Sequence, residues 1–158
     1  MPLISDLIRA ERQRIVDAGE AADFAAINSG LCGDFADQIV ALLQEADPSS
    51  APEALEIVNF FQIDPDTGFA FDSGGPMDRA VAQAVLPEMM PPDGMTWDEF
   101  DIFLRDADVS MGLHVFVIHE GMVYDSELPE GGRSIFDLPF FQRFMERSRE
   151  RASQPAFA

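Results

Sequence analysis

The 158-residue chain is 47% apolar and long enough for one compact domain with a single core. It carries 29 acidic and 10 basic residues, a formal net charge of -19, and every basic residue is an arginine. A surface this acidic repels nucleic-acid phosphates and anionic lipids, so we expect neither nucleic acid nor membrane as a partner. The simplest explanation of the negative charge is that it keeps the protein soluble or adapts it to high salt.

The start of the chain mixes charged and apolar residues and lacks the basic segment and apolar run of a signal peptide. No stretch reaches the ~18 consecutive apolar residues of a membrane-spanning helix. One cysteine excludes an internal disulfide. We therefore expect a cytoplasmic protein, with delivery to a host left open.

Helices are predicted where apolar residues recur at helical spacing. Thr96 and Glu99 form a capping-box pattern before one of these helices, and Pro139 suits the first turn of another. The predicted helices cover residues 2–18, 21–27, 33–45, 78–85, 97–106 and 139–151.

Strands are predicted over 54–63 and 69–71, and a hairpin over 113–125 turns at Glu120-Gly121. Residues 129–132 hold Pro and Gly and are predicted to be loop. Helices precede strands instead of alternating with them, which favours an α+β fold with a largely antiparallel sheet. We expect a single domain over 1–152 and a frayed tail over 153–158.

Cys32 is the only cysteine, and it lies between Gly30 and Gly33 at the start of a predicted helix. The positive end of the helix dipole favours thiolate, the nucleophilic form of cysteine. A lone cysteine is more often a small buried apolar residue. Whether Cys32 is a nucleophile therefore depends on a base elsewhere in the chain.

The predicted hairpin holds both histidines, His114 and His119, on opposite faces of its strand. His119 sits at the turn, where we expect exposure. With a two-residue turn, Asp125 becomes a diagonal neighbour of His114, and Glu127 lies opposite it. Asp125 is thus the first candidate to orient a His114 base, and Glu127 is the second.

The spacing of Cys32, His114 and Asp125 carries a family resemblance. Gly30-x-Cys32-Gly33-x-Phe35-Ala36, then His114-Val115-Phe116 and Tyr124-Asp125, resemble the Cys–His–Asp pattern of the papain-like and transglutaminase-like cysteine protease superfamily. The stretches 126–131 and 137–141 are similar to those of small bacterial and phage-type members. The resemblance implies a Cys-bearing helix packed on an antiparallel β-sheet. It also implies that Cys32 is the nucleophile, His114 the general base and acid, and Asp125 the orienting residue.

The chain departs from the papain-like pattern in two places. No Gln precedes Cys32 as an oxyanion donor, so Asn28 or Ser29 is the candidate for this role, together with the Cys32 backbone N–H. Asp34 follows the cysteine closely, and its charge is expected to oppose thiolate formation.

These observations predict a thiol-dependent hydrolase, either a peptidase, an amidase or a deamidase, that needs no cofactor or metal. The two separated histidines and one cysteine make a zinc cluster improbable. The expected substrate is a peptide or protein, and the negative charge would suit a basic one. The alternatives are a transglutaminase-type acyl transferase and a non-catalytic acidic interaction protein on the same fold. The sequence does not indicate the oligomeric state.

Overall fold

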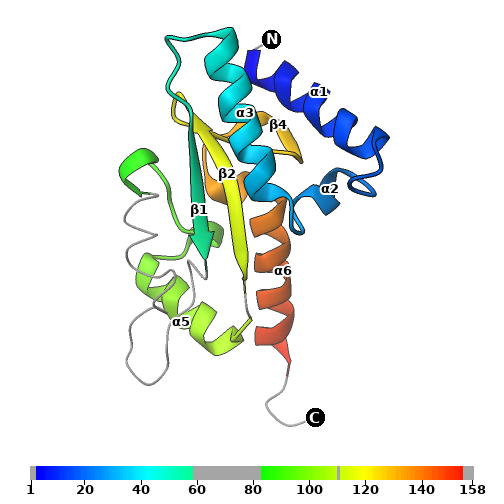
Figure 1. Cartoon of the computed structure of the whole chain (residues 1–158). Helices are drawn as coiled ribbons and strands as arrows, with labels where there is room; N and C mark the ends of the chain where they lie inside the picture. The colour runs from blue at the N-terminus through cyan, green and yellow to red at the C-terminus, as the bar shows by residue number, and fades with distance from the viewer. Residues whose placement is uncertain (1–2, 59–82, 110, 155–158) are drawn as a thin grey trace. The chain divides into compact units, whose positions relative to one another are not determined.

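The computed structural model describes residues 3–58, 83–109 and 111–154 (Figure 1). The chain forms two compact units, one from residues 1–56 and 114–139 and the other from 57–113 and 140–158. The extent of the predicted single domain, 1–152, stays a prediction. Residues 155–158 of the predicted tail lie outside the described residues.

The first unit begins with the helices α1 (Leu3–Asp17), α2 (Phe24–Ile27) and α3 (Cys32–Ala46). The first and third match the predicted helices closely, because each has an apolar stripe at helical spacing. The second is shorter than the predicted 21–27. It begins where the Asp23 side chain caps it by accepting a hydrogen bond from the Ala26 backbone N–H at 2.8 Å.

Within the described residues the sheet has four strands, in the order β1 (Glu53–Val58), β2 (Leu113–His119), β3 (Met122–Asp125) and β4 (Leu128–Gly132). Strand β3 pairs antiparallel with both β2 and β4. The helices α1, α2 and α3 come before the sheet, and its strands β2, β3 and β4 pair antiparallel. The protein is therefore α+β, as the order of the predicted elements indicates.

The hairpin of β2 and β3 has the register that a two-residue turn predicts. Glu120 and Gly121 form the turn, and both have positive φ (52° and 74°), as a type I′ turn requires. The paired residues are Val117 with Tyr124, Ile118 with Val123, and His119 with Met122.

The prediction of a loop at 129–132 is wrong, because these residues belong to β4. Among the described strands β4 is at the edge of the sheet, where proline is tolerated because one side of the strand pairs with no neighbour. Gly131 adopts φ +80° and passes directly against the ring of Tyr124. Pro and Gly here serve an edge strand, although in the sequence they resemble a turn.

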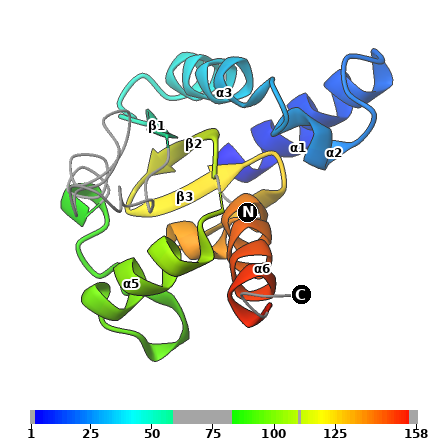
Figure 2. The same ribbon diagram turned by 90° about the horizontal axis from the view of Figure 1, so that it is seen from below.

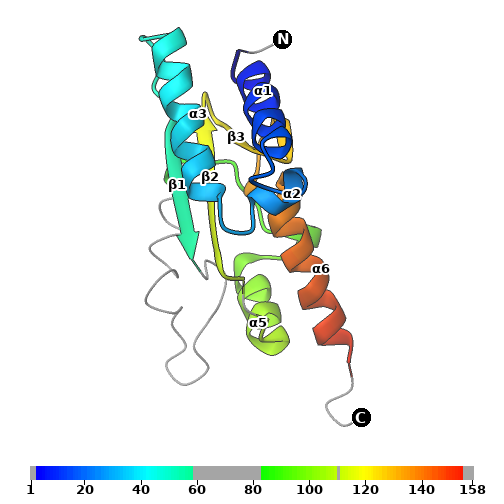
Figure 3. The same ribbon diagram turned by 45° about the vertical axis from the view of Figure 1, so that its right-hand side comes forward.

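Helix α3 covers one face of the sheet, and α1 lies beside it (Figures 1 and 2). Viewed from the side, α3 runs along β1 and β2 (Figure 3). Between the helices and the sheet lies a core to which β2 and β3 contribute Val117 and Tyr124. Its helical members are Ile4, Ile8, Ile15, Ile27, Phe35, Ala36, Ile39 and Leu43. This packing fixes the start of α3 against the sheet.

The second unit contains α5 (Trp97–Ala107), α6 (Pro139–Ser153) and the short 3-10 turn η1 (Pro92–Gly94). The predicted capping box of α5 is present, with Thr96 and Glu99 each accepting from the other's backbone N–H. Arg149 of α6 binds Asp93 of η1 at 2.8 Å.

Three predictions fall wholly or partly outside the described residues. The strand predicted over 54–63 is seen to Val58, and the remainder is not described. The strand predicted over 69–71 is also outside, and of the helix predicted over 78–85 only 83–85 are described, as helix. Within the described parts of the chain, no helix is long and apolar enough to span a membrane.

The close approach at Gly131 predicts a large effect on stability. A Cβ there would lie 2.6 Å from Cε1 of Tyr124, and the backbone has positive φ. Gly131→Ala should lower the free energy of unfolding by about 2–4 kcal/mol, measured by urea denaturation. The control is Gly121→Ala, which has a similar φ (+74°) and nothing within 4 Å of the added Cβ, and should cost only about 1 kcal/mol. Equal losses would contradict the steric explanation.

Candidate active site

Cys32 is the first residue of α3, and only 5% of its surface is exposed. No side chain caps this helix at Leu31, whose carbonyl accepts from the Phe35 N–H at 2.8 Å. The N–H groups at the start of α3 are therefore available to the thiol, and the backbone of Gly33 hydrogen-bonds to it. The helix start thus stabilises negative charge on the sulfur.

His114 of β2 and Asp125 of β3 are both buried, and their side chains are in contact. Nε2 of His114 lies 2.9 Å from Oδ2 of Asp125, and since a carboxylate only accepts, Nε2–H is the donor. The two residues are 0% and 2% exposed. Phe116, two residues along the same face of β2, stacks on the imidazole at 5.9 Å between ring centroids. The predicted diagonal pairing therefore brings the two side chains together.

The second oxygen of Asp125 is held by the turn that follows. Oδ1 accepts backbone N–H groups from Glu127 at 2.9 Å and from Leu128 at 3.1 Å. Both oxygens of this buried carboxylate are thus hydrogen-bonded, which keeps it in one orientation and supports its charge.

The pKa of the Cys32 thiol is lowered from its ordinary value of 9.0. Burial alone would raise it, but a hydrogen bond with His114, backbone hydrogen bonds from Val115 and Gly33, and the His114 charge outweigh burial. Since Nε2 is engaged by Asp125, Nδ1 is the ring nitrogen left for the thiol. Asp125 and Cys32 thus both act on the imidazole of His114, Asp125 through the hydrogen bond to Nε2 and Cys32 through the pKa of each group.

The pKa of His114 is raised above 6.5. Burial would lower it, but hydrogen bonds with Asp125 and Cys32, and their charges, raise it by more. The resulting contribution to folding stability is complete below pH 6.5 and is lost as the pH rises through the folded pKa. The opposite shifts of Cys32 and His114 favour a thiolate–imidazolium pair.

His119 lies apart from this arrangement, as its opposite face predicts. It pairs with Met122 beside the hairpin turn, and its nearest ion-pair partner is Glu120, at 3.8 Å. Its side chain is 14% exposed, so it is less open to solvent than the turn position suggested.

The roles predicted for Asn28, Ser29 and Glu127 stay predictions, and the structure shows the contacts that these residues make. Asn28, offered as an oxyanion donor, is buried, and its Nδ2 donates to Oε1 of Glu127 at 2.8 Å. Glu127, the second candidate to orient His114, accepts this bond, and Asp125 is the carboxylate found on His114. Ser29 is exposed, and its backbone N–H donates to the Ala26 carbonyl.

The turn after β3 has further bonds that the sequence did not indicate. The buried Ser126 donates its hydroxyl to the Phe24 carbonyl at 2.9 Å. Arg12 donates to the Ser126 carbonyl at 3.1 Å and lies 4.0 Å from the centre of the Phe24 ring. The two hydrogen bonds link positions more than 100 apart in the chain, and no local pattern predicts them.

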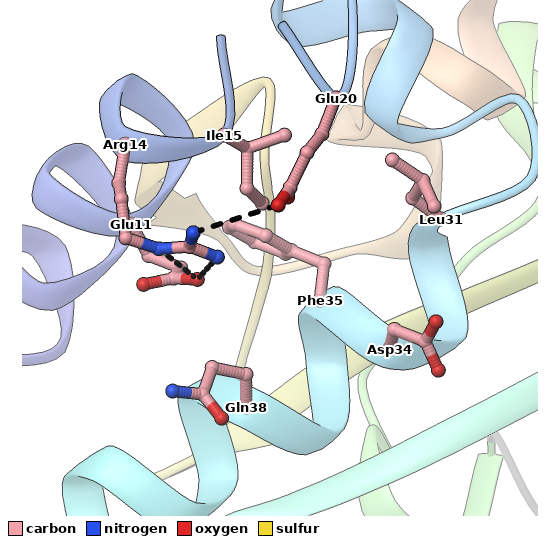
Figure 4. Close-up of a pocket in the computed structure, with 8 residues that line it drawn as sticks. All are labelled: Glu11, Arg14, Ile15, Glu20, Leu31, Asp34, Phe35 and Gln38. Carbon is pink, nitrogen blue, oxygen red and sulfur yellow. Dashed lines mark hydrogen bonds and ion pairs between the residues drawn. The ribbon is translucent and has the colours of Figure 1, made fainter. Parts of the chain in front are cut away.

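Asp34 does not act on Cys32 in the way its sequence position suggests. Its exposed side chain lines a pocket of about 300 Å³ between α1 and α3 (Figure 4). In this pocket Arg14 binds Glu11 at 2.6 Å and lies 3.8 Å from Glu20. Cys32 is not among the lining residues, and the charge that shifts its pKa is that of His114.

Comparisons with known proteins leave the site to be argued from its own geometry. No family model, curated protein or solved structure matches the chain. Among the residues that the structure describes, no group of three or more His, Cys, Asp and Glu side chains is arranged to hold a metal ion. The chemistry open to these residues is that of a thiol, an imidazole and a carboxylate.

The Asp125 carboxylate should control the titration of His114. Asp125→Asn removes the charge and leaves the burial, so the pKa of His114 should fall, as followed by NMR of its ring protons. The measurement is made in a His119→Gln background, so that the imidazole signals come from His114 alone. Asp37→Asn, the same change at an exposed position of α3, should leave the titration unaltered. An unchanged His114 pKa in Asp125→Asn would show that the carboxylate is not what supports the imidazolium.

Proposed function

We propose that the protein is a thiol-dependent hydrolase of the papain-like or transglutaminase-like type, with Cys32, His114 and Asp125 as its catalytic triad. The observation that carries the proposal is the buried hydrogen bond between His114 and Asp125 at 2.9 Å, together with the opposite pKa shifts of Cys32 and His114. These are the three groups that cysteine nucleophilic catalysis uses, and the pKa shifts have the direction that it needs. The Cys-bearing helix packed on an antiparallel sheet supports the same proposal.

In the proposed reaction the sulfur of Cys32 attacks the carbonyl carbon of an amide and forms a tetrahedral intermediate. His114 holds the thiol proton at Nδ1 and delivers it to the leaving amine as the C–N bond breaks. Water then attacks the thioester and transfers one proton to His114, and breaking the C–S bond releases the carboxylic acid and returns Cys32 as the thiolate beside the His114 imidazolium. Asp125 keeps the imidazole oriented throughout. An amine in place of water would give the alternative acyl transfer.

The oxyanion of the intermediate needs donors near the sulfur. Cys32 is the first residue of α3, so its backbone N–H has no acceptor within the helix and is suited to this task. Asn28 already donates to Glu127, which weakens its case as the second donor. Ser29 is exposed and keeps its hydroxyl as the remaining candidate of the two.

A non-catalytic binding protein is the second candidate, and the burial of the site favours it. Cys32 presents 5% of its surface and His114 presents none, so a substrate carbonyl needs local opening to reach the sulfur. The net charge of -19 would then serve recognition of a basic protein. The state of the thiol separates the two candidates, because binding alone does not require a thiolate.

Thiolate formation gives a test that does not depend on substrate access. With one cysteine in the chain, no other thiol adds to the ultraviolet absorbance of thiolate, and the midpoint of Cys32 should lie below pH 9.0. His114→Ala should move the midpoint upward, and so should full denaturation. Asp34→Asn is the control and should leave it in place, since Asp34 lies in the pocket of Figure 4. A wild-type midpoint at or above 9.0 would overturn the catalytic proposal.

Hydrolysis itself should depend on the same residues. In a screen of peptide amides and acyl-amine substrates, Cys32→Ala should abolish any cleavage that the protein supports. His114→Ala should lower kcat/KM by roughly 10²–10⁴, the usual contribution of general acid–base catalysis. Activity retained in Cys32→Ala would assign the cleavage to other residues or to a contaminant.

A further inference from the structure

Asn28 and Glu127 are joined by a hydrogen bond across 99 positions of the chain. Asn28 precedes the segment that leads to Cys32, and Glu127 follows Asp125. We propose that Asn28 and Glu127 are positioning residues that hold the Cys32 segment in register with the turn that orients Asp125. This inference rests on the proposed function and assigns to both residues a role other than contact with the substrate.

The Asn28 end of the bond is fixed to α2. Asn28 is 4% exposed, and its backbone N–H donates to the Ala25 carbonyl at 3.0 Å. Nδ2 donates to Oε1 of Glu127 at 2.8 Å. Only three residues separate Asn28 from Cys32, and the Leu31 N–H within them bonds to the Ile27 carbonyl at 3.0 Å. A shift of Asn28 therefore carries the start of α3 with it.

The Glu127 end is fixed to the orienting carboxylate. The Glu127 backbone N–H donates to Oδ1 of Asp125 at 2.9 Å, and the other oxygen of that carboxylate binds His114. Glu127 thus holds Asp125 through its main chain and Asn28 through its side chain.

A second hydrogen bond, from Ser126 to α2, holds the turn after β3 in addition to the bond between Asn28 and Glu127. At the opposite end of α2, the Phe24 carbonyl accepts the Ser126 hydroxyl at 2.9 Å. The short helix is therefore attached to adjacent residues of the turn, Ser126 and Glu127, by one bond near each of its ends. Two separated attachments fix an orientation that a single hydrogen bond would leave free to rotate.

Of the two polar atoms in the Asn28 side chain, only Nδ2 has a hydrogen-bond partner among the described residues. Oδ1 of Asn28 is buried and has no hydrogen-bond partner within the described residues. A buried acceptor without a partner is unfavourable, so packing alone would be better served by an apolar side chain. Turning the amide over would place its oxygen against the Glu127 carboxylate. The donor aimed at Glu127 is the feature that an amide supplies here.

The bond should influence Cys32 through the triad. The titratable groups that act on the thiol are His114 on β2 and, through it, Asp125 on β3, while Asp34 on its own helix is exposed. The influence of His114 on the thiol depends on the separation between the imidazole and the start of α3. Release of the turn relaxes this separation and weakens that influence.

The test exchanges the donor and acceptor of the bond. Asn28→Asp sets two carboxylates against each other and breaks it, whereas Glu127→Gln retains an acceptor. The double variant Asn28→Asp with Glu127→Gln restores a donor and an acceptor in reversed order, and it has the net charge of the wild type. The measurements are the Cys32 thiolate midpoint by ultraviolet absorbance and the melting temperature.

Asn28→Asp should raise the Cys32 pKa by about 0.7 units, a fivefold change in the thiolate equilibrium, as an ordinary hydrogen bond allows. Glu127→Gln should stay near the wild type, and the double variant should return to it. A direct effect of the new Asp charge would persist in the double variant, so recovery excludes that explanation. If Asn28→Asp does not fold, Asn28→Ala and Glu127→Ala replace it, and each is expected to raise the Cys32 pKa in the same way.

A lower melting temperature with an unchanged Cys32 pKa in Asn28→Asp, or in Asn28→Ala and Glu127→Ala, would overturn the inference, because it would show a structural role alone. Failure of the double variant to recover its Cys32 pKa would overturn it as well. Either result leaves the proposed function standing. An ordinary thiol pKa in the wild-type protein would instead overturn the proposed function, and this inference with it.

Discussion

The Asp125 carboxylate is the group on which the arrangement of the site depends. It is buried, and a buried charge is tolerated only where charge or hydrogen bonds compensate the lost hydration. One oxygen takes the His114 ring N–H, and the other takes two backbone N–H groups. The hairpin register, the imidazole orientation and the path of the chain into β4 all have to agree for these bonds to form together.

The thiol and the imidazole depend on each other in the same way. Burial opposes the charged form of both Cys32 and His114 and is the largest single influence on each pKa. Each shift nevertheless runs toward the charged form, because the partner's hydrogen bond and charge, helped by Asp125 and the start of α3, outweigh burial. Neither residue would be expected to ionise in this way in the same surroundings without the other.

Local patterns were enough to predict the parts of the site that lie on regular elements. The two-residue turn at Glu120-Gly121 determines the hairpin register, and the register brings Asp125 to His114. The apolar stripe after Cys32 predicts α3, and the capping box predicts α5. Each of these inferences uses residues within one element or its immediate neighbour.

Long-range pairing and edge geometry could not be predicted in this way. The partners of Asn28 and Ser126 lie about 100 residues away, so sequence proximity suggested other roles for Asn28 and Glu127. The Pro and Gly residues of β4 are typical of a turn, and only their place at the edge of the sheet accounts for a strand. Asp34 is near Cys32 in sequence, but its side chain lines the pocket between α1 and α3.

The single cysteine also has a consequence for the chemistry of oxidation. A thiol with a lowered pKa reacts more readily with peroxides and forms a sulfenic acid. In proteins with a second cysteine nearby, a disulfide can trap that product and protect it, but this chain has no second thiol. Recovery of Cys32 therefore depends on a reductant from outside the chain, and further oxidation to the sulfinic acid would be permanent.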